Sequence, residues 1–309
     1  MNEPDSGTRE AGVARLDGRT AAHLTRLVQE GVEHSFLQLA CEILNLTQKV
    51  LAVNGRQLSS LLRSSGINAP DGSLLEVSRK LFQPVAETNG LRQIRENLDI
   101  FKDDPANRWL SQLAAELQVP IPTIDAAIDA QDTSARARQS TFLSTLFRHP
   151  SGRFGNDPGS VLKEFCGAYY AGMIITYAQG FALLAEASVR YRFDLDLARI
   201  ANLWNAENSA RSELLTYVAD AFEATPSLPN LLCDENLSEQ LMAHQESLRH
   251  AVWRASEFDI IMPGMLASLD YLDAFKDAWL PCNLVSIRPV PIHDRWNWGR
   301  AVDAEIIRP

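Results

Sequence analysis

The amino-acid sequence predicts an all-α fold, a single helical domain composed of two similar halves. Apolar residues recur at helical spacing over long segments of the 309-residue chain. No segment shows the alternation of strands and helices that builds a parallel sheet. Blocks of residues in the first half recur in the second half at one fixed separation, which is typical of duplicated supersecondary units.

The first expected element is a long helix that begins at Arg19. Its apolar residues recur three or four positions apart, as they do on one face of a helix. They are Leu24, Leu27, Val28, Val32, Phe36, Leu39, Ile43, Leu46 and Val50. Asn54 and Gly55 supply the turn chemistry that ends this helix. Residues 1–18 are rich in Gly, Ser and charged side chains, which predicts a disordered tail.

Shorter helices are expected in the rest of the first half. The apolar pattern places them at Gln57–Ser64, Leu74–Leu81, Leu91–Phe101, Leu110–Leu117 and Ile121–Gln131. Pro120 and Pro122 separate the last two, because proline interrupts helical hydrogen bonding. Residues 150–159 have the sequence PSGRFGNDPG and are predicted to form a loop between the two halves.

The second half repeats the first at a separation of 141 positions. The matched pairs are Ala114 and Ala255, Glu116 and Glu257, Pro122 and Pro263, Asp129 and Asp270, Gly31 and Gly172, and Gln38 and Gln179. A constant separation in two distant blocks argues against coincidence between unrelated amphipathic helices. We therefore expect a duplicated helical domain over residues 19–280, with halves of about 19–149 and 160–280, followed by a C-terminal arm of residues 281–309.

The composition is that of a globular protein with no nucleic-acid or membrane partner. Hydrophobic residues make up 46% of the chain, and the formal net charge is −10 with both signs interspersed. Binding to nucleic acid or to an anionic membrane needs a basic face, which this balance disfavours. The polar N-terminus lacks the apolar segment of a signal peptide, and no run of about 18 apolar residues is evident. No membrane span and a cytoplasmic location are therefore expected.

The cysteine pattern supports neither a zinc site nor a disulfide framework. The four cysteines are widely separated and include no C-x-x-C pair: Cys41, Cys166, Cys233 and Cys282. Cys41 and Cys166 lie in apolar helical segments, where we expect buried structural thiols.

Several blocks of the chain resemble the all-helical C-terminal domain of 6-phosphogluconate dehydrogenase. The segment from His23, HLTRLVQEGVEHSFLQLACEILNL, is similar to the family's helix H-x-V-K-M-V-H-N-G-I-E-Y-x-x-M-Q-L-x-x-E. The segment from Glu116, ELQVPIPTIDAAI, is similar to the family's E-x-G-V-P-x-x-x-I helix, and three further blocks lie within residues 168–284. The resemblance covers about residues 21–293. It implies a helical homodimer in which the C-terminal arm reaches the partner's active site.

The functional positions of that family differ in this sequence. The resemblance places the family's catalytic lysine at Arg26, whose guanidinium group does not titrate near neutral pH. The family's catalytic glutamate is retained as Glu33. Gln29, Glu30 and His34 stand where the family has a histidine, an asparagine and a phosphate-binding tyrosine.

The positions that hold the family's phosphate group have changed as well. Asp104 and Ala106 replace a lysine and a threonine, and Gln131 replaces an arginine. The arginine and histidine of the arm are retained as Arg288 and His293. A phosphate dianion needs convergent cationic donors, so we do not expect 6-phosphogluconate itself to be the ligand.

No cofactor is expected for this chain alone. The family binds NADP through a glycine-rich turn after its first strand, in a dinucleotide-binding domain that we do not expect before the helical region of this chain. Gly152, Gly155 and Gly159 have the wrong spacing and context for such a turn. NADP binding would therefore require a separate dinucleotide-binding subunit.

A charged stripe on the first helix is the main candidate site. Arg26, Glu30, Glu33 and His34 occupy positions i, i+4, i+7 and i+8, which lie on one helix face. As a rebuilt polar site, the stripe would use Glu33 or His34 as general base and Arg26 to hold an anionic group. The alternative is a solvated helix face with an i,i+4 ion pair between Arg26 and Glu30. Glu30 and His34 would also suit a metal, but pairs at this spacing are common by chance and no metal is expected.

Three functions remain open from the sequence. The first is an enzyme of specialised metabolism with a divergent active site, performing non-redox acid/base chemistry (decarboxylation, elimination or proton transfer) on a small polar or anionic metabolite. Its catalytic residues would be Glu33, His34 and His293, and its substrate-binding residues Arg26, Gln29, Glu30, Asp104, Gln131 and Arg288. The second is a subunit of a split NADP-dependent dehydrogenase. The third is a non-catalytic binding or scaffold protein.

Overall fold

The computed structural model describes residues 19–64, 74, 78, 105–137, 157–207 and 212–276. These residues form helices and no strand, which confirms the predicted all-α fold. The chain divides into two units, Met1–Tyr271 and Leu272–Pro309, and the side-chain and backbone contacts described below lie within the first. The tail of residues 1–18, the helix Leu91–Phe101, most of Leu74–Leu81 and the arm of residues 281–309 lie outside the described residues. The predicted domain and half boundaries remain predictions.

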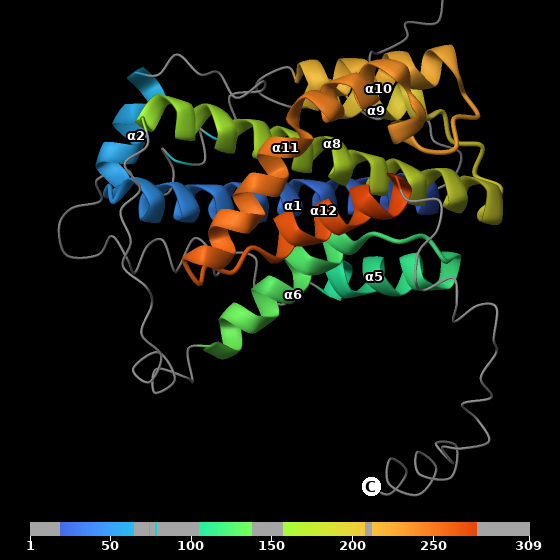
Figure 1. The fold of residues 1–309 in the computed structure, drawn as a ribbon. Coiled ribbons are helices and arrows are strands. Elements are labelled where there is room, and N and C mark those ends of the chain that lie inside the picture. The colour runs from blue at the N-terminus through green and yellow to red at the C-terminus, as the bar shows by residue number, and fades with distance from the viewer. Residues whose placement is uncertain are drawn as a thin grey trace, which may run out of the picture. The chain divides into compact units, whose positions relative to one another are not determined.

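Two long helices form the centre of the fold. Helix α1 spans Arg19–Leu51 and helix α8 spans Pro158–Tyr191, and they lie side by side (Figure 1). They run in opposite directions, because Val32 faces Gly180 whereas Leu39, two turns later on α1, faces the earlier residue Gly172. A Cβ atom at position 180 would lie 2.7 Å from the Val32 side chain, so glycine permits this close approach.

The start of α8 corrects the predicted loop at 150–159. Pro158 is the first residue of the helix, and Asp157 is its N-cap, accepting a 2.9 Å hydrogen bond from the Ser160 backbone amide. Proline at this position is compatible with a helix, because the first helical residues have no intrahelical partner for their N–H groups. Residues 150–156 of the predicted loop lie outside the described part of the chain.

Helix α8 bears on the expectation that the chain has no membrane span. By length and composition α8 qualifies, with a mean hydropathy of 1.2 over its best window. However, 72% of that window is buried inside the protein, as in the core helix of a folded domain.

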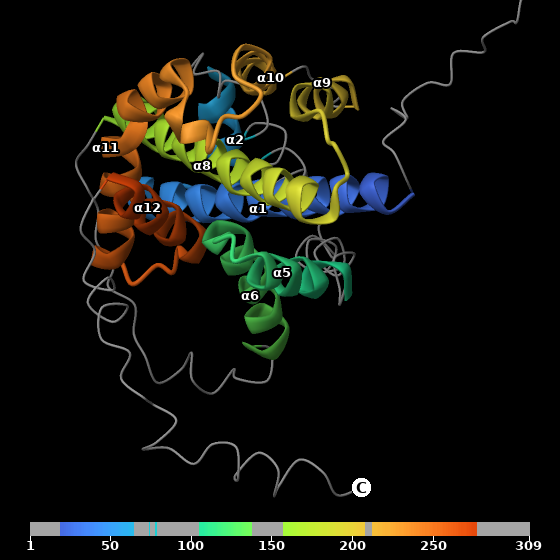
Figure 2. The ribbon, with the colours of Figure 1, turned by 90° about the vertical axis from the view of Figure 1, so that its right-hand side faces the viewer.

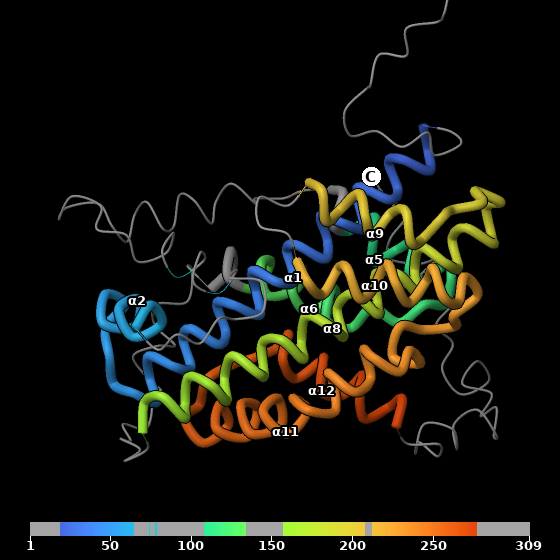
Figure 3. The backbone as a smooth tube through the Cα atoms, turned by 90° about the horizontal axis from the view of Figure 1, so that it is seen from above, coloured from blue at the N-terminus to red at the C-terminus, as the bar shows by residue number. Residues whose placement is uncertain are grey.

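Pairs of shorter helices pack around α1 and α8 (Figures 1 and 2). Helices α5 and α6 lie against α1, α9 and α10 form a pair beside α8, and α11 packs along α8 (Figure 3). The bounds are α2 Gly55–Ser64, α5 Pro105–Leu117, α6 Pro122–Ala137, α9 Leu197–Glu207, α10 Glu213–Ala224, the 3-10 helix η2 Leu231–Cys233, α11 Glu235–Glu257 and α12 Pro263–Lys276.

Aromatic packing joins α9 and α10 to α8. The ring of Phe181 on α8 lies 5.0 Å from Trp204 of α9 and 5.4 Å from Phe222 of α10, measured between ring centroids. Phe181 also contacts Tyr177 at 6.3 Å. Its side chain is fully buried, so this cluster is a main source of apolar burial between the three helices.

The duplication is visible in the backbone as well as in the sequence. The turn between α5 and α6 has a left-handed residue, Gln118 (φ 58°), and the turn between α11 and α12 has one at Asp259 (φ 52°), 141 positions later. The hydrogen bonds of these turns also repeat. The Val119 amide donates to the Ala114 carbonyl and the Ile260 amide to the Ala255 carbonyl, each at 2.9 Å.

Each long helix caps a short helix of the opposite half. The side chain of Gln179 on α8 accepts a 3.0 Å hydrogen bond from the Thr123 amide at the start of α6. In return, the carboxylate of Glu42 on α1 accepts hydrogen bonds from the amides of Gly264 and Met265 at the start of α12, both at 2.9 Å. These bonds satisfy N–H groups that have no partner within their own helices.

Two of the described cysteines have thiol pKa values above the usual range. Burial raises the pKa of the Cys41 and Cys166 thiols to about 11, so both are protonated at neutral pH. Cys166 is buried as expected, Cys41 is partly exposed and Cys233 is exposed. Cys282 lies beyond the described residues.

Candidate active site

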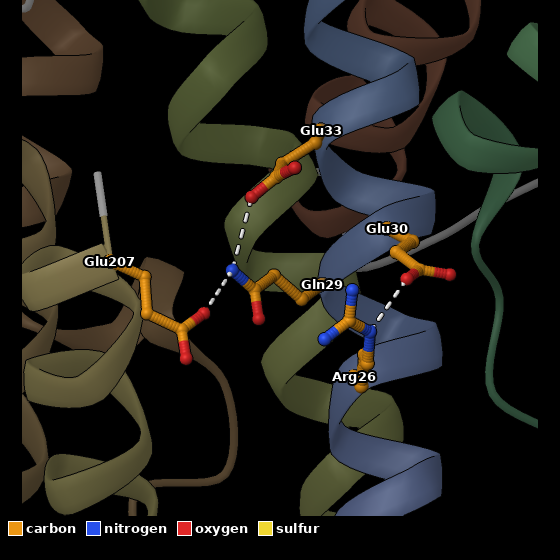
Figure 4. A network of polar contacts seen from close by, with 5 residues as sticks. All are labelled: Arg26, Gln29, Glu30, Glu33 and Glu207. Atoms are coloured by element: carbon orange, nitrogen blue, oxygen red, sulfur yellow. Dashed lines mark hydrogen bonds and ion pairs between the residues drawn. The ribbon is translucent and has the colours of Figure 1, made fainter. Parts of the chain in front are cut away.

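The charged stripe of α1 forms two separate polar groups in the structure. One is the ion pair of Arg26 and Glu30, and the other joins Gln29 and Glu33 to Glu207 at the end of α9 (Figure 4). The i, i+4 spacing that places side chains on one helix face produces both contacts along α1. The contact with Glu207 depends instead on how α9 lies against α1.

The ion pair predicted from the sequence is confirmed. Arg26 Nε donates to Glu30 Oε1 at 2.9 Å, and the two side chains are 77% and 45% exposed. Both charges therefore remain in contact with water while they neutralise each other. Arg26 would have to leave Glu30 before it could hold an anionic ligand with its Nε–H.

We expect Arg26→Ala to change the free energy of unfolding by less than about 0.5 kcal/mol, because exposed ion pairs contribute little net stability. The measurement is chemical denaturation of the two proteins at low salt. Glu186→Ala, which removes an exposed carboxylate on α8, is the matched control. A loss above about 1.5 kcal/mol would show that Arg26 has a structural role that this exposed pair does not explain.

Gln29 holds two carboxylates at a single amide group. Its Nε2 donates to Glu33 Oε1 at 3.1 Å and to Glu207 Oε2 at 3.2 Å. The two hydrogens of the amide thus go to acids on different helices. Sequence reasoning missed Glu207, because it is 178 positions from Gln29 and nothing in its local pattern distinguishes it from other exposed acids.

His34 faces a different neighbour, the backbone of α6. Its Nε2 lies 3.4 Å from the Ala127 carbonyl oxygen. A carbonyl only accepts, so Nε2 carries the proton and Nδ1 carries the lone pair of the neutral ring. Burial lowers the pKa of His34 below its usual 6.5, so the ring is neutral at neutral pH. Gln131 lies one helical turn beyond Ala127 on α6 and is partly exposed.

Three of the predicted site residues lie beyond the part of the chain that the structure describes. They are Asp104, Arg288 and His293, and their predicted roles stay predictions. Among the described residues, no group of three or more His, Cys, Asp or Glu side chains lies together in a way that could hold a metal. Glu30 and His34, the proposed i,i+4 pair, contact Arg26 and α6 respectively.

Two further acids were not singled out from the sequence. Glu42 on α1 is only 4% exposed, and burial raises the pKa of its carboxyl group above the usual 4.5. Glu164 on α8 lies 3.4 Å from Arg254 and 3.7 Å from His250, both on α11. Both carboxylates link helices, and neither lies in the stripe.

The fold and the stripe together define a class of protein, the duplicated all-helical domains that carry polar residues on a long first helix. The family model for the 6-phosphogluconate dehydrogenase C-terminal domain matches residues 22–288. The chain belongs to this family.

Individual relatives support the same assignment. The chain is 30% identical over 285 residues to the decarboxylating 6-phosphogluconate dehydrogenase of Synechocystis sp., an alignment that covers 92% of this chain and 58% of the relative. It is 28% identical over 273 residues to the Lactococcus lactis enzyme, covering 88% and 58%. The solved Plasmodium falciparum 6-phosphogluconate dehydrogenase superposes with a TM-score of 0.76 at 25% identity, covering 84% of this chain and 56% of that one. The chain thus spans a little over half the length of these relatives.

Proposed function

We propose that the stripe on α1 is the acid/base site of an enzyme that acts without redox chemistry on a small polar or anionic metabolite. Decarboxylation, elimination and proton transfer all fit this description. The observation that supports the proposal is the hydrogen bond from Gln29 to Glu33, the glutamate that the resemblance identifies as catalytic. Because Gln29 also donates to Glu207, it fixes the Glu33 carboxylate relative to Glu207. A general acid or base must be oriented before it can transfer a proton efficiently.

In this proposal Glu33 transfers the proton, and His34 is the second candidate base. A neutral histidine is in the correct protonation state to accept a proton at neutral pH. Arg26, Gln29, Glu30 and Gln131 would contact the substrate, together with Asp104, Arg288 and the catalytic His293. The enzyme would act as a cytoplasmic homodimer, in which the arm of residues 281–309 completes the partner's site.

The charges of the stripe argue against a phosphorylated sugar acid as substrate. Glu30, Glu33 and Glu207 bring three carboxylates to the two groups, whereas Arg26 is the cation among them and is already paired. Like charges disfavour a phosphate dianion at such a surface. A ligand with hydroxyl groups or a single carboxylate would suit it better.

Two other functions have support of their own. A split NADP-dependent dehydrogenase is favoured by the Plasmodium falciparum relative, whose structures include the cofactor NADP+ and the substrate 6-phosphogluconate. This chain would then need a dinucleotide-binding subunit, and Glu33 or His34 would replace the lysine base. A non-catalytic binding or scaffold role is favoured by the exposed, mutually satisfied pair of Arg26 and Glu30.

A thermal-shift screen distinguishes the three functions. The full chain is heated with NADP, NAD, divalent metals, and a panel of sugar acids and carboxylated or phosphorylated metabolites. A ligand that binds only the folded state raises the melting temperature. We expect a shift with a sugar acid or carboxylate and none with NADP.

The hit is then tested on Glu33→Gln and on the matched control Glu186→Gln, an exposed acid on α8. Glu33→Gln should abolish turnover of the hit with an unchanged melting temperature in the absence of ligand, and Glu186→Gln should leave turnover intact. A shift with NADP would revive the dehydrogenase hypothesis. Full turnover in Glu33→Gln would rule out the proposed acid/base role.

A further inference from the structure

We propose that a chain of buried hydrogen bonds couples the start of α6 to the start of α12, so that the two helix starts open together as one unit. The chain of bonds joins the caps of the two halves, and the proposal does not rest on the function proposed above. It follows from the donor of each hydrogen bond, from the burial of the side chains and from the groups at the two ends.

The hydroxyl groups of Thr123 and Ser268 make the link between α6 and α12. Their oxygens lie 3.0 Å apart, and on distance alone either could be the donor. Ser268 Oγ also lies 2.8 Å from the Gly264 carbonyl oxygen, which can only accept, so the single hydrogen of this hydroxyl is used there. Thr123 is therefore the donor to Ser268.

Gln179 on α8 stands at one end of the chain of bonds. Its Oε1 accepts from the Thr123 backbone amide at 3.0 Å, and a backbone amide can only donate. The Nε2 group therefore faces the Thr123 hydroxyl, to which it donates at 2.8 Å. Thr123 Oγ1 thus accepts from Gln179 and donates to Ser268. Every hydrogen atom along this path points from α8 toward α12.

The peptide group between Gly264 and Met265 continues the path to Glu42 on α1. Its carbonyl accepts from Ser268, and its N–H, which is the Met265 amide, donates to Glu42 Oε2 at 2.9 Å. Resonance within a peptide group connects its carbonyl to its N–H. Hydrogen bonds in such a chain polarise one another, so each is strengthened by its neighbours. The caps supplied by Gln179 and Glu42 are therefore parts of one chain of bonds.

The side chains along this path are removed from water. Thr123, Gln179 and Ser268 are fully buried, and Glu42 is 4% exposed. If one helix start opened by itself, the hydroxyl left behind would lose its partner without gaining water, which is costly. Opening both starts together lets water reach both hydroxyl groups. The joint opening is therefore the less costly one.

The coupled unit reaches the candidate site through α6. Ala127 lies about one helical turn after Thr123, and its carbonyl oxygen lies 3.4 Å from His34 Nε2. A change at the start of α12 is therefore expected to affect the turn of α6 that faces His34.

Native-state amide hydrogen exchange measures the free energy of opening at each helix start. Exchange is followed by mass spectrometry at increasing denaturant concentrations below the unfolding transition. In the wild type, peptides that cover residues 122–127 and 263–268 should open with the same free energy and the same denaturant dependence. Different opening free energies for these two peptides would overturn the proposal.

Ser268→Ala provides the second arm of the test. It removes the link between the hydroxyl groups but keeps the backbone amides that Gln179 and Glu42 cap. The two peptides should then separate, with opening constants that differ several-fold. If this variant does not fold, Thr123→Val removes the same link and the same separation is expected.

Ser35→Ala is the matched control. Ser35 is also fully buried, and its hydroxyl donates to the carbonyl four residues earlier, that of Gly31, at 2.7 Å, just as Ser268 donates to Gly264. Ser35 lies outside the chain of bonds, so this variant should leave the two peptides together. Peptides that stay together in Ser268→Ala, or that separate equally in Ser35→Ala, would show that the link does not couple the two helix starts.

Discussion

Phe181→Ala is expected to lower the free energy of unfolding by about 4 kcal/mol, as is typical when a buried aromatic ring is removed from a well-packed core. The Phe181 side chain is fully buried and contacts Trp204, Phe222 and Tyr177. Removing the ring leaves a cavity where α8, α9 and α10 meet, and the surrounding rings cannot close it without leaving their own contacts. Chemical denaturation measures the loss.

Two controls separate ring packing from general disruption. Phe181→Leu keeps most of the apolar volume and should lose less than half as much stability. Val189→Ala, on the same helix with a 76% exposed side chain, should have almost no effect. A loss below about 1 kcal/mol for Phe181→Ala would mean that α9 and α10 do not depend on this cluster.

Glu42→Ala is expected to lower the free energy of unfolding by about 3 kcal/mol, because it leaves two buried backbone amides without their acceptor. These are the amides of Gly264 and Met265. Alanine also removes a carboxylate whose ionisation is unfavourable in the folded state, and this gain offsets part of the loss. Chemical denaturation at neutral pH measures the net effect.

Glu30→Ala is the matched control, since it removes an exposed carboxylate from the same helix. It should change stability by less than about 0.5 kcal/mol. Equal effects of the two substitutions would contradict the role of Glu42 as a helix cap. A gain of stability in Glu42→Ala would mean that the cost of burying the charge exceeds the value of both capping bonds.

The helices of this fold could be predicted because their signals are local. The apolar pattern from Leu24 to Val50 already defines α1, and the helix predicted at Ile121–Gln131 corresponds to α6, Pro122–Ala137. The start of α8 was harder to predict. Pro158 lies in a segment rich in Gly and Pro, which is typical of a loop, and the Asp157 side chain is what allows the helix to begin there.

In the candidate site, only the contacts between residues of the same helix could be predicted from the sequence. The pair of Arg26 and Glu30 follows from their i,i+4 spacing, and the structure contains it. Glu207 meets Gln29 because α9 packs near α1, and no pattern within one helix encodes that approach. Glu42 looks like any polar residue on an amphipathic helix, and its burial depends on the position of α12.

The exchange of caps between the halves has a consequence for how such a chain is assembled. Glu42 of the first half caps α12, and Gln179 of the second half caps α6, so each half supplies a cap for a helix of the other half. A polypeptide of half this length could close these contacts only by pairing with another copy of itself. The capping contacts are therefore arranged as in a domain-swapped dimer whose two subunits are covalently joined, so that contacts between chains become contacts within one chain.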